Sequence, residues 1–122
     1  MSEILKYKTE EDIQIGDLVA IDQVSNLVHR ATMFDRKKVI GVCADVFPDT
    51  EEVLICNQGV IDVNVTGIIC LGDHIGVSQK PGKAEAINYE IQEERQFDVR
   101  SVGKVVGLYD VYSKARVLLN IK

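Results

Sequence analysis

The chain has 122 residues, of which 46% are hydrophobic and 27% are charged, and its formal net charge at pH 7 is −5. This length fits one domain with a core of its own. The acidic balance argues against a nucleic-acid-binding protein, which usually carries a basic stripe, and no apolar run approaches the roughly 20 residues of a transmembrane helix.

The predicted elements are short strands in regular succession. Residues 1–12 are polar and mixed, and they are expected to form an arm or an edge strand. After them, apolar and polar residues alternate in runs rich in Val and Ile, whose branching at Cβ favours the pleated sheet. The expected strands cover residues 18–22, 27–31, 38–46, 52–57, 60–66, 74–78, 84–87, 102–109 and 115–121.

About ten short strands without a convincing amphipathic helix predict an all-β fold, either a small β-barrel or a sandwich. Residues 88–98 are ambiguous, with a short helix and a loop both open, and they are interpreted as a surface insertion. Because neither a linker nor a low-complexity tract interrupts the chain, residues 13–122 are expected to form a single β-barrel domain.

A repeated phrase predicts that this domain is built from two similar halves. Gly16-Asp17 and Gly72-Asp73 stand before similar strands and are 56 residues apart. The phrases Val-Ile-Gly, ending at Gly41, and Val-Val-Gly, ending at Gly107, are 66 residues apart. The second half is therefore expected to carry about ten extra residues, placed at 88–98.

Glycines and aspartates between the strands are predicted to make structural turns. Glycine adopts backbone angles that other residues avoid, and aspartate caps turns by accepting bonds from nearby N–H groups. An aspartic-protease pair is the alternative for the two Gly-Asp phrases, but its usual Asp-Thr-Gly or Asp-Ser-Gly order is reversed here. The predicted turn residues are Gly16, Asp17, Gly41, Gly59, Gly67, Gly72, Asp73 and Gly107.

No catalytic residue, cofactor-binding residue or metal ligand is predicted. Cys43, Cys56 and Cys70 are odd in number and lie in apolar runs, so they are expected to be buried, unpaired and slow to react. His29 and His74 lack the spacing of zinc ligands. A Cys–His nucleophile pair would be adjacent in space rather than in sequence, but core thiols are inert. Glycine-rich phosphate loops and Gly-x-Ser-x-Gly are absent.

Two groups of bacteriophage structural proteins are similar to this chain. From Gly16 to Leu119 it runs through Gly-Asp-Leu-Val, Lys-Val-Ile-Gly-Val, Leu-Gly-Asp-His-Ile, Gly-Lys-Val-Val-Gly and Arg-Val-Leu-Leu, which resembles the small capsid decoration proteins. These are β-rich, typically trimeric and sit outside the phage head. Residues 59–73 also resemble the phrase Gly-x-Val-x-Val-x-Val-x-Gly-x-Ile-x-x-Gly-Asp of the β module at the ends of tail-fibre and tail-spike proteins.

The resemblance implies a non-enzymatic virion protein that decorates and stabilises the head of a phage or phage-like particle. Its expected partners are further copies of itself, as a homotrimer, and the major capsid protein, with no cofactor, nucleic acid or membrane. Residues 1–11 are expected to be an arm free to reach a neighbour or the shell. The N-terminus lacks the pattern of a signal peptide, which fits assembly in the bacterial cytoplasm. The alternative is a receptor- or glycan-binding module of a tail fibre.

Overall fold

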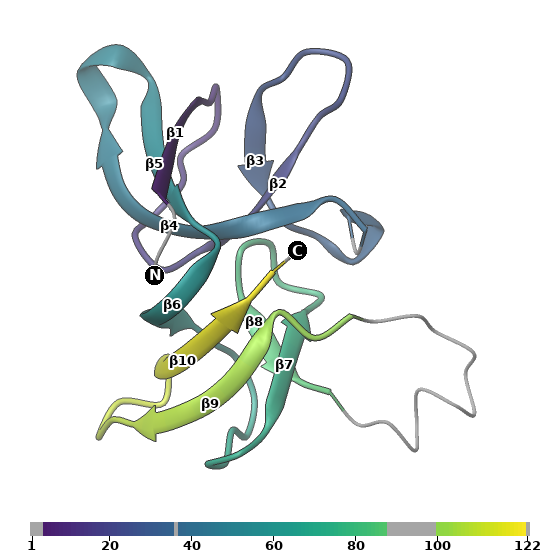
Figure 1. Cartoon of the computed structure of the whole chain (residues 1–122), viewed down its shortest axis with the longest axis vertical. Helices are drawn as coiled ribbons and strands as arrows, with labels where there is room; N and C mark the ends of the chain where they lie inside the picture. Colours follow the sequence, from purple (N-terminus) through teal and green to yellow (C-terminus); the bar gives the residue numbers. More distant parts are fainter. Residues whose placement is uncertain (1–3, 36, 88–99, 122) are drawn as a thin grey trace.

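Two five-stranded antiparallel sheets make up the computed structural model, which describes residues 4–35, 37–87 and 100–121. They lie one above the other along the long axis, and β5 leads into β6 between them (Figure 1). The first sheet has the order β1-β5-β4-β2-β3 and the second β6-β10-β9-β7-β8. The strands are β1 (Ile4–Lys8), β2 (Leu18–Ile21), β3 (Val28–Arg30), β4 (Val39–Phe47), β5 (Glu52–Cys56), β6 (Gln58–Asn64), β7 (His74–Val77), β8 (Ala84–Ala86), β9 (Gly103–Leu108) and β10 (Lys114–Asn120).

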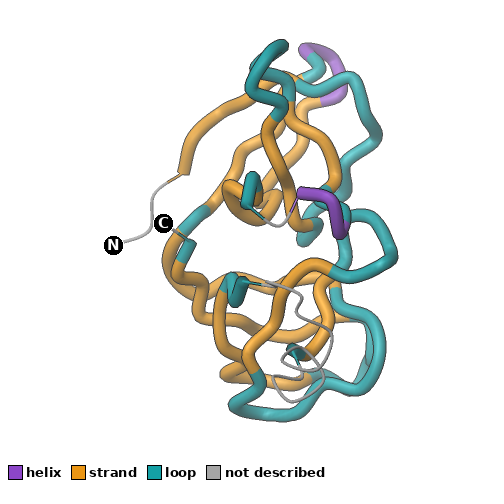
Figure 2. Tube along the Cα trace, turned by 90° about the vertical axis from the view of Figure 1, so that its right-hand side faces the viewer, coloured by secondary structure: helices purple, strands orange, loops and turns teal. Residues whose placement is uncertain are grey.

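The all-β prediction is therefore confirmed, and the fold is sandwich-like rather than a closed barrel. In the first sheet, the edge strands β1 and β3 approach only through one parallel bridge, Thr9 to Val28, and in the second a bridge from Val65 to Ala84 does the same. A single bridge leaves most of each edge unpaired. Viewed from the side, the strands form two separate curled layers (Figure 2). Two short 3-10 turns, Met33–Asp35 and Pro48–Thr50, complete the first half.

The prediction of two similar halves is also confirmed, because both sheets have the same strand order when five is added to each strand number. We call residues 1–57 the first half and residues 58–122 the second half. Strands β2 and β7 occupy equivalent places, as the Gly-Asp phrases predict. For β1 to β3, the equivalent residue of the second half lies 56 positions further along the chain, as Asn64 does from Lys8. For β4 and β5, it lies 62 positions further along, as Lys114 does from Glu52.

This register corrects two details of the predicted duplication. Gly41 pairs with Val19, and the pair at the same place in the second half is Gly103 with Ile75, so the counterpart of Gly41 is Gly103 and not Gly107. The change of offset from 56 to 62 gives the second half six extra residues rather than about ten. The helix-or-loop insertion expected at 88–98 lies outside the described residues.

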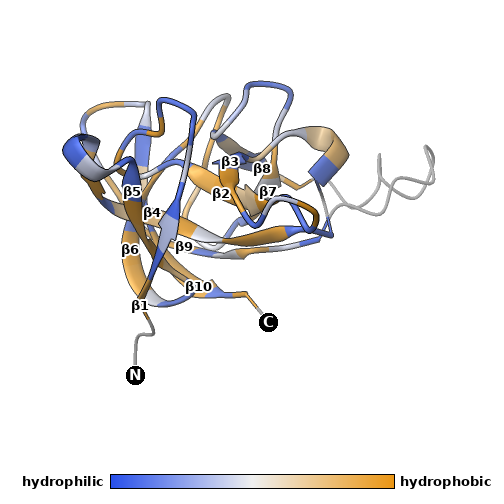
Figure 3. Ribbon diagram, turned by 90° about the horizontal axis from the view of Figure 1, so that it is seen from above, coloured by the Kyte–Doolittle hydropathy of each residue, from blue (hydrophilic) through white to orange (hydrophobic). Residues whose placement is uncertain are grey.

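Each half has a hydrophobic core on one face of its sheet, and the apolar side chains that fill it come from equivalent positions in the two halves. The ribbon is most apolar along strands such as β2 and β6 and most polar in the connecting loops (Figure 3). In the first half this core holds Ile13, Val19, Val28, Cys43, Val53 and Ile55. The equivalent positions of the second half are filled by Ile69, Ile75, Ala84, Val105, Ala115 and Val117.

The two halves differ in the opposite face of the sheet. In the first half this face carries Leu18 and Val42, which are fully buried in one apolar cluster with residues of the second half. The equivalent residues of the second half are His74 and Lys104, and both are exposed. The same backbone therefore presents a buried face in one half and a solvated face in the other, because the side chains differ.

Residues 4–8 form the edge strand β1, one of the two structures expected for residues 1–12, and residues 1–3 lie outside the described residues. Strand β1 pairs in register with β5 along its whole length. Beyond it, the Thr9 N–H donates to the Glu51 carbonyl at 2.9 Å, and the Thr9 hydroxyl donates to the Val28 carbonyl at 2.8 Å. Among the described residues, no helix is long and apolar enough to cross a membrane.

Candidate functional site

The two Gly-Asp turns share one local geometry. Asp17 Oδ2 accepts the N–H of Gln14 at 3.0 Å, and Asp73 Oδ2 accepts the N–H of Cys70 at 2.9 Å. The glycines before them have φ of 95° and 87°, values in the left-handed region that favours glycine. The aspartates act here as turn caps, and no second carboxylate faces either of them in the hydrogen bonds of the described residues.

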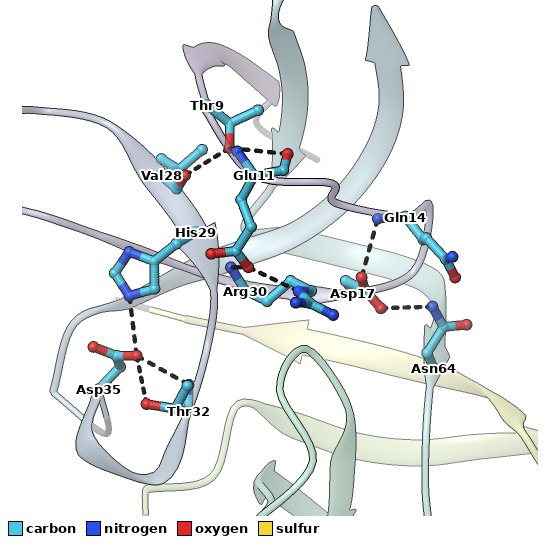
Figure 4. A network of polar contacts seen from close by, with 10 residues as sticks. All are labelled: Thr9, Glu11, Gln14, Asp17, Val28, His29, Arg30, Thr32, Asp35 and Asn64. Carbon is cyan, nitrogen blue, oxygen red and sulfur yellow. Dashed lines mark hydrogen bonds and ion pairs between the residues drawn. The ribbon is translucent and has the colours of Figure 1, made fainter. Parts of the chain in front are cut away.

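Only the first of these turns joins the two halves. The Asn64 side-chain amide donates to Asp17 Oδ1 at 2.9 Å (Figure 4). The same amide donates to the Ile15 carbonyl at 3.0 Å, and the Asn64 N–H donates to the Gly16 carbonyl at 2.9 Å. Asp17 is therefore buried, with 4% of its surface exposed, whereas the equivalent Asp73 is partly exposed. We call the contact of Asp17 with Asn64 the junction.

A glycine lets the junction close. Gly82 has φ of 80°, and a Cβ added to it would lie 2.9 Å from Cγ of Asp17. Its carbonyl accepts the N–H of Leu18 at 2.7 Å, and its own N–H donates to the Ala31 carbonyl at 2.9 Å. Sequence reasoning missed the roles of Gly82 and Asn64, because neither residue type signals a contact with a distant segment.

Two further groups of polar contacts lie near the junction in the first half (Figure 4). Glu11 Oε1 accepts from Arg30 Nε at 2.7 Å and from the Arg30 N–H at 3.0 Å, and this hydrogen bond raises the pKa of Arg30. Asp35 Oδ2 lies 3.0 Å from His29 Nε2 and accepts from the N–H and hydroxyl of Thr32. Burial alone would raise the pKa of Asp35, but these hydrogen bonds outweigh it and lower the pKa below 3.8.

The remaining predicted turn glycines divide into two kinds. Gly41, Gly59 and Gly107 lie inside strands β4, β6 and β9 rather than in turns. At Gly41 a close approach explains the residue, since an added Cβ would lie 2.5 Å from the Cys56 carbonyl oxygen. Gly67 is in a bend with φ of 77° and open space around it.

The expectation that all three thiols are buried is wrong for one of them. Cys43 and Cys56 are buried and free, and burial raises the pKa of Cys43 to about 11. Cys70 is free but exposed, because it stands at the start of the Gly72-Asp73 turn, where the equivalent residue of the first half, Gln14, is exposed as well. Within the described ranges, no group of three or more His, Cys, Asp or Glu side chains could hold a metal ion.

One serine–histidine contact has the residue types of a hydrolase but not the geometry. His74 Nδ1 lies 3.1 Å from Ser101 Oγ. The Ser101 hydroxyl donates to the Gly103 carbonyl at 3.1 Å, so its proton is directed away from the imidazole. A serine nucleophile needs its hydroxyl proton directed to the histidine base.

An exposed apolar patch with a groove lies at one end of the second half. The groove has a volume of about 290 Å³. It is bounded by the connection after β6 and by the β9–β10 hairpin, two segments far apart in the sequence. We call its five exposed large side chains the apolar surface: Ile68, Leu108, Tyr109, Val111 and Tyr112.

The fold, but not the sequence, is similar to a known phage protein. A crystal structure described as "head fiber gp8.5 N base in bacteriophage phi29" is similar to this chain with a TM-score of 0.62 and 15% sequence identity. The similarity covers 98% of this chain and 95% of that chain. No protein-family model matches the chain, and no curated protein matches it significantly.

Proposed function

We propose that the chain is a structural protein of a phage or phage-like virion, without enzymatic activity, that sits on the head surface and stabilises it as a decoration protein. The observation that carries this proposal is the likeness of fold to a head fiber base over almost the full length of both chains. The decoration role in particular is proposed from the resemblance of the sequence phrases to capsid decoration proteins.

The proposed mechanism is mechanical. Two sheets locked together by a buried polar junction and a shared apolar cluster form a rigid body, and rigid copies lose little conformational entropy when they bind. A protein that binds only the assembled shell stabilises it by mass action. We propose that the copies act as a homo-oligomer, with a trimer as the expected state, on the major capsid protein, and that assembly takes place in the bacterial cytoplasm.

Binding to purified heads tests the function. Phage heads that lack the chain would be isolated from a lysate, mixed with the purified protein and sedimented, and their release of DNA on heating would be followed. We expect saturable binding and release at a higher temperature when the protein is bound. The same assay with intact bacterial cells covers the tail-fibre alternative. Binding to cells or cell-wall sugars, with none to heads, would overturn the decoration proposal.

A further inference from the structure

Exposed apolar side chains are concentrated in the second half. Fourteen large apolar side chains are exposed among the described residues, and nine of them belong to the second half. Five of these nine form the apolar surface, where Ile68 and Tyr112 are 88% and 91% exposed beside the groove. Soluble proteins rarely leave such clusters uncovered unless the cluster is an interaction site.

The duplicated fold shows that this apolar character is not needed to build the half. The residues of the first half equivalent to Ile68, Val111 and Tyr112 are Asp12, Asp49 and Thr50. Both halves form the same hairpin and the same preceding connection with these different side chains. Leu108 and Tyr109 correspond to Val46 and Phe47, which are apolar in the first half as well. The second half therefore differs from the first at Ile68, Val111 and Tyr112, and the shared fold does not explain the apolar side chains at these three positions.

The distribution of charge between the two halves favours a second copy of the chain as the partner that covers this surface. The first half contains 11 acidic and six basic side chains, whereas the second half contains eight of each. The whole net charge of −5 thus belongs to the first half. Two copies of an acidic protein repel each other least where they meet through a neutral region. The apolar surface lies in the second half, whose described residues carry four acidic and six basic side chains, so it is not part of the acidic first half.

Three polar side chains near the apolar surface, Tyr109, Asp62 and Arg116, are already paired with one another. The Tyr109 hydroxyl donates to Asp62 Oδ1 at 2.5 Å, and Arg116 Nε lies 3.7 Å from the same oxygen. Covering the surface therefore leaves few polar groups without partners, which is the main penalty of burying an interface.

We infer that copies of this chain associate with one another through the apolar surface of the second half. This deepens the homo-oligomer proposed above and rests on it. The exposed Tyr112 stands on the rim of the groove, so each copy offers both a projecting aromatic side chain and a recess lined by Ile68 and Leu108. A surface with both features is self-complementary, and closed symmetry is the usual result for identical copies. The acidic first half then faces outward, where it can meet another partner.

Two matched double variants test the inference. V111D/Y112T introduces the residues of the first half at equivalent positions of the apolar surface. V24D/F34T makes the same change of charge and polarity at exposed first-half side chains that are 94% and 95% exposed. All four side chains are exposed, so both variants are expected to fold. Sedimentation velocity over a wide concentration range, with circular dichroism as the folding check, gives the association constants.

We expect V111D/Y112T to weaken self-association at least about 30-fold, the effect of losing one aromatic hot spot, and V24D/F34T to leave it unchanged. Equal association of the V111D/Y112T and unmodified proteins, or equal loss in both variants, would overturn the inference. So would a protein that stays monomeric at all concentrations. Sedimentation with phage heads separates the two proposals. A monomer that still binds heads overturns only the self-association surface, and an oligomer that binds no heads overturns only the decoration function.

Discussion

The carboxylate of Asp17 accepts a hydrogen bond of 2.9 Å from the side-chain amide of Asn64, 47 residues further along the chain, and both residues are buried. This contact links a turn of the first half to the end of β6 in the second. The equivalent turn at Asp73 has the same internal hydrogen bond but is partly exposed. Comparing substitutions at Asp17 and Asp73 can therefore distinguish the stability that comes from capping a turn from the stability that comes from joining the two halves.

Replacing Asp17 by alanine is expected to lower the free energy of unfolding by about 2–4 kcal/mol, because one of the two N–H groups of the buried Asn64 amide loses its acceptor and the turn loses its cap at the Gln14 N–H. Asp73→Ala removes only the turn cap and should lower it by about 1 kcal/mol or less. Urea unfolding of both variants measures the difference. Equal losses would show that the junction contributes nothing beyond the cap.

Glycine substitutions test the register of the duplication. Gly41→Ala and Gly103→Ala should each lower the free energy of unfolding by about 3 kcal/mol, because the added Cβ would lie 2.5 Å from a carbonyl oxygen of the neighbouring strand. Gly107→Ala should lower it by about 1 kcal/mol or less, since its nearest neighbour is the Arg116 side chain at 3.1 Å. Thermal and urea unfolding measure all three. A loss for Gly107→Ala as large as that for Gly41→Ala would contradict this register.

The three thiols should react at very different rates in the folded protein. Cys70 is exposed and should be alkylated first, whereas Cys43 and Cys56 should react at least about 100-fold more slowly, since they are buried and react only through opening of the fold. The raised pKa of Cys43, about 11, slows it further because the thiolate is the nucleophile. Peptide mass spectrometry after timed alkylation gives each rate, and Cys70→Ser is the control that should remove the fast phase. Fast labelling of Cys43 in the native protein would refute the assignment.

Acid should destabilise the protein partly through Asp35. The pKa of Asp35 is lower in the folded chain than its ordinary value of 3.8, so its carboxylate stabilises the fold above that pH. This contribution is lost as the pH falls through 3.8 and below the folded pKa. Asp35→Asn should therefore cost about 1 kcal/mol at pH 7 and make stability less dependent on pH between about 5 and 2. Melting temperatures measured across this range, with the exposed Asp49→Asn as control, check it. An unchanged acid profile in Asp35→Asn would contradict it.

Local pattern in the sequence was enough to predict the strands and their duplication. Alternation of apolar and polar residues fixes which face of a strand is buried, and this pattern needs no knowledge of the neighbours. The repeated Gly-Asp phrase predicted that β2 and β7 are equivalent, because a turn with positive φ and an aspartate cap is specified by adjacent residues alone.

Only the tertiary structure decided which residues of the two halves are equivalent, and which of them are buried or exposed. Gly41 and Gly107 stand in similar phrases, yet the strand register makes Gly103 the equivalent of Gly41, because the six extra residues of the second half come before β9. Cys70 lies in an apolar run, but it is exposed because it stands at the start of a turn whose equivalent residue in the first half, Gln14, is exposed as well. The burial of Asp17 and the exposure of the apolar surface depend on which parts of each half pack against the other half. That is a relation between segments distant in sequence, so no local pattern contains it.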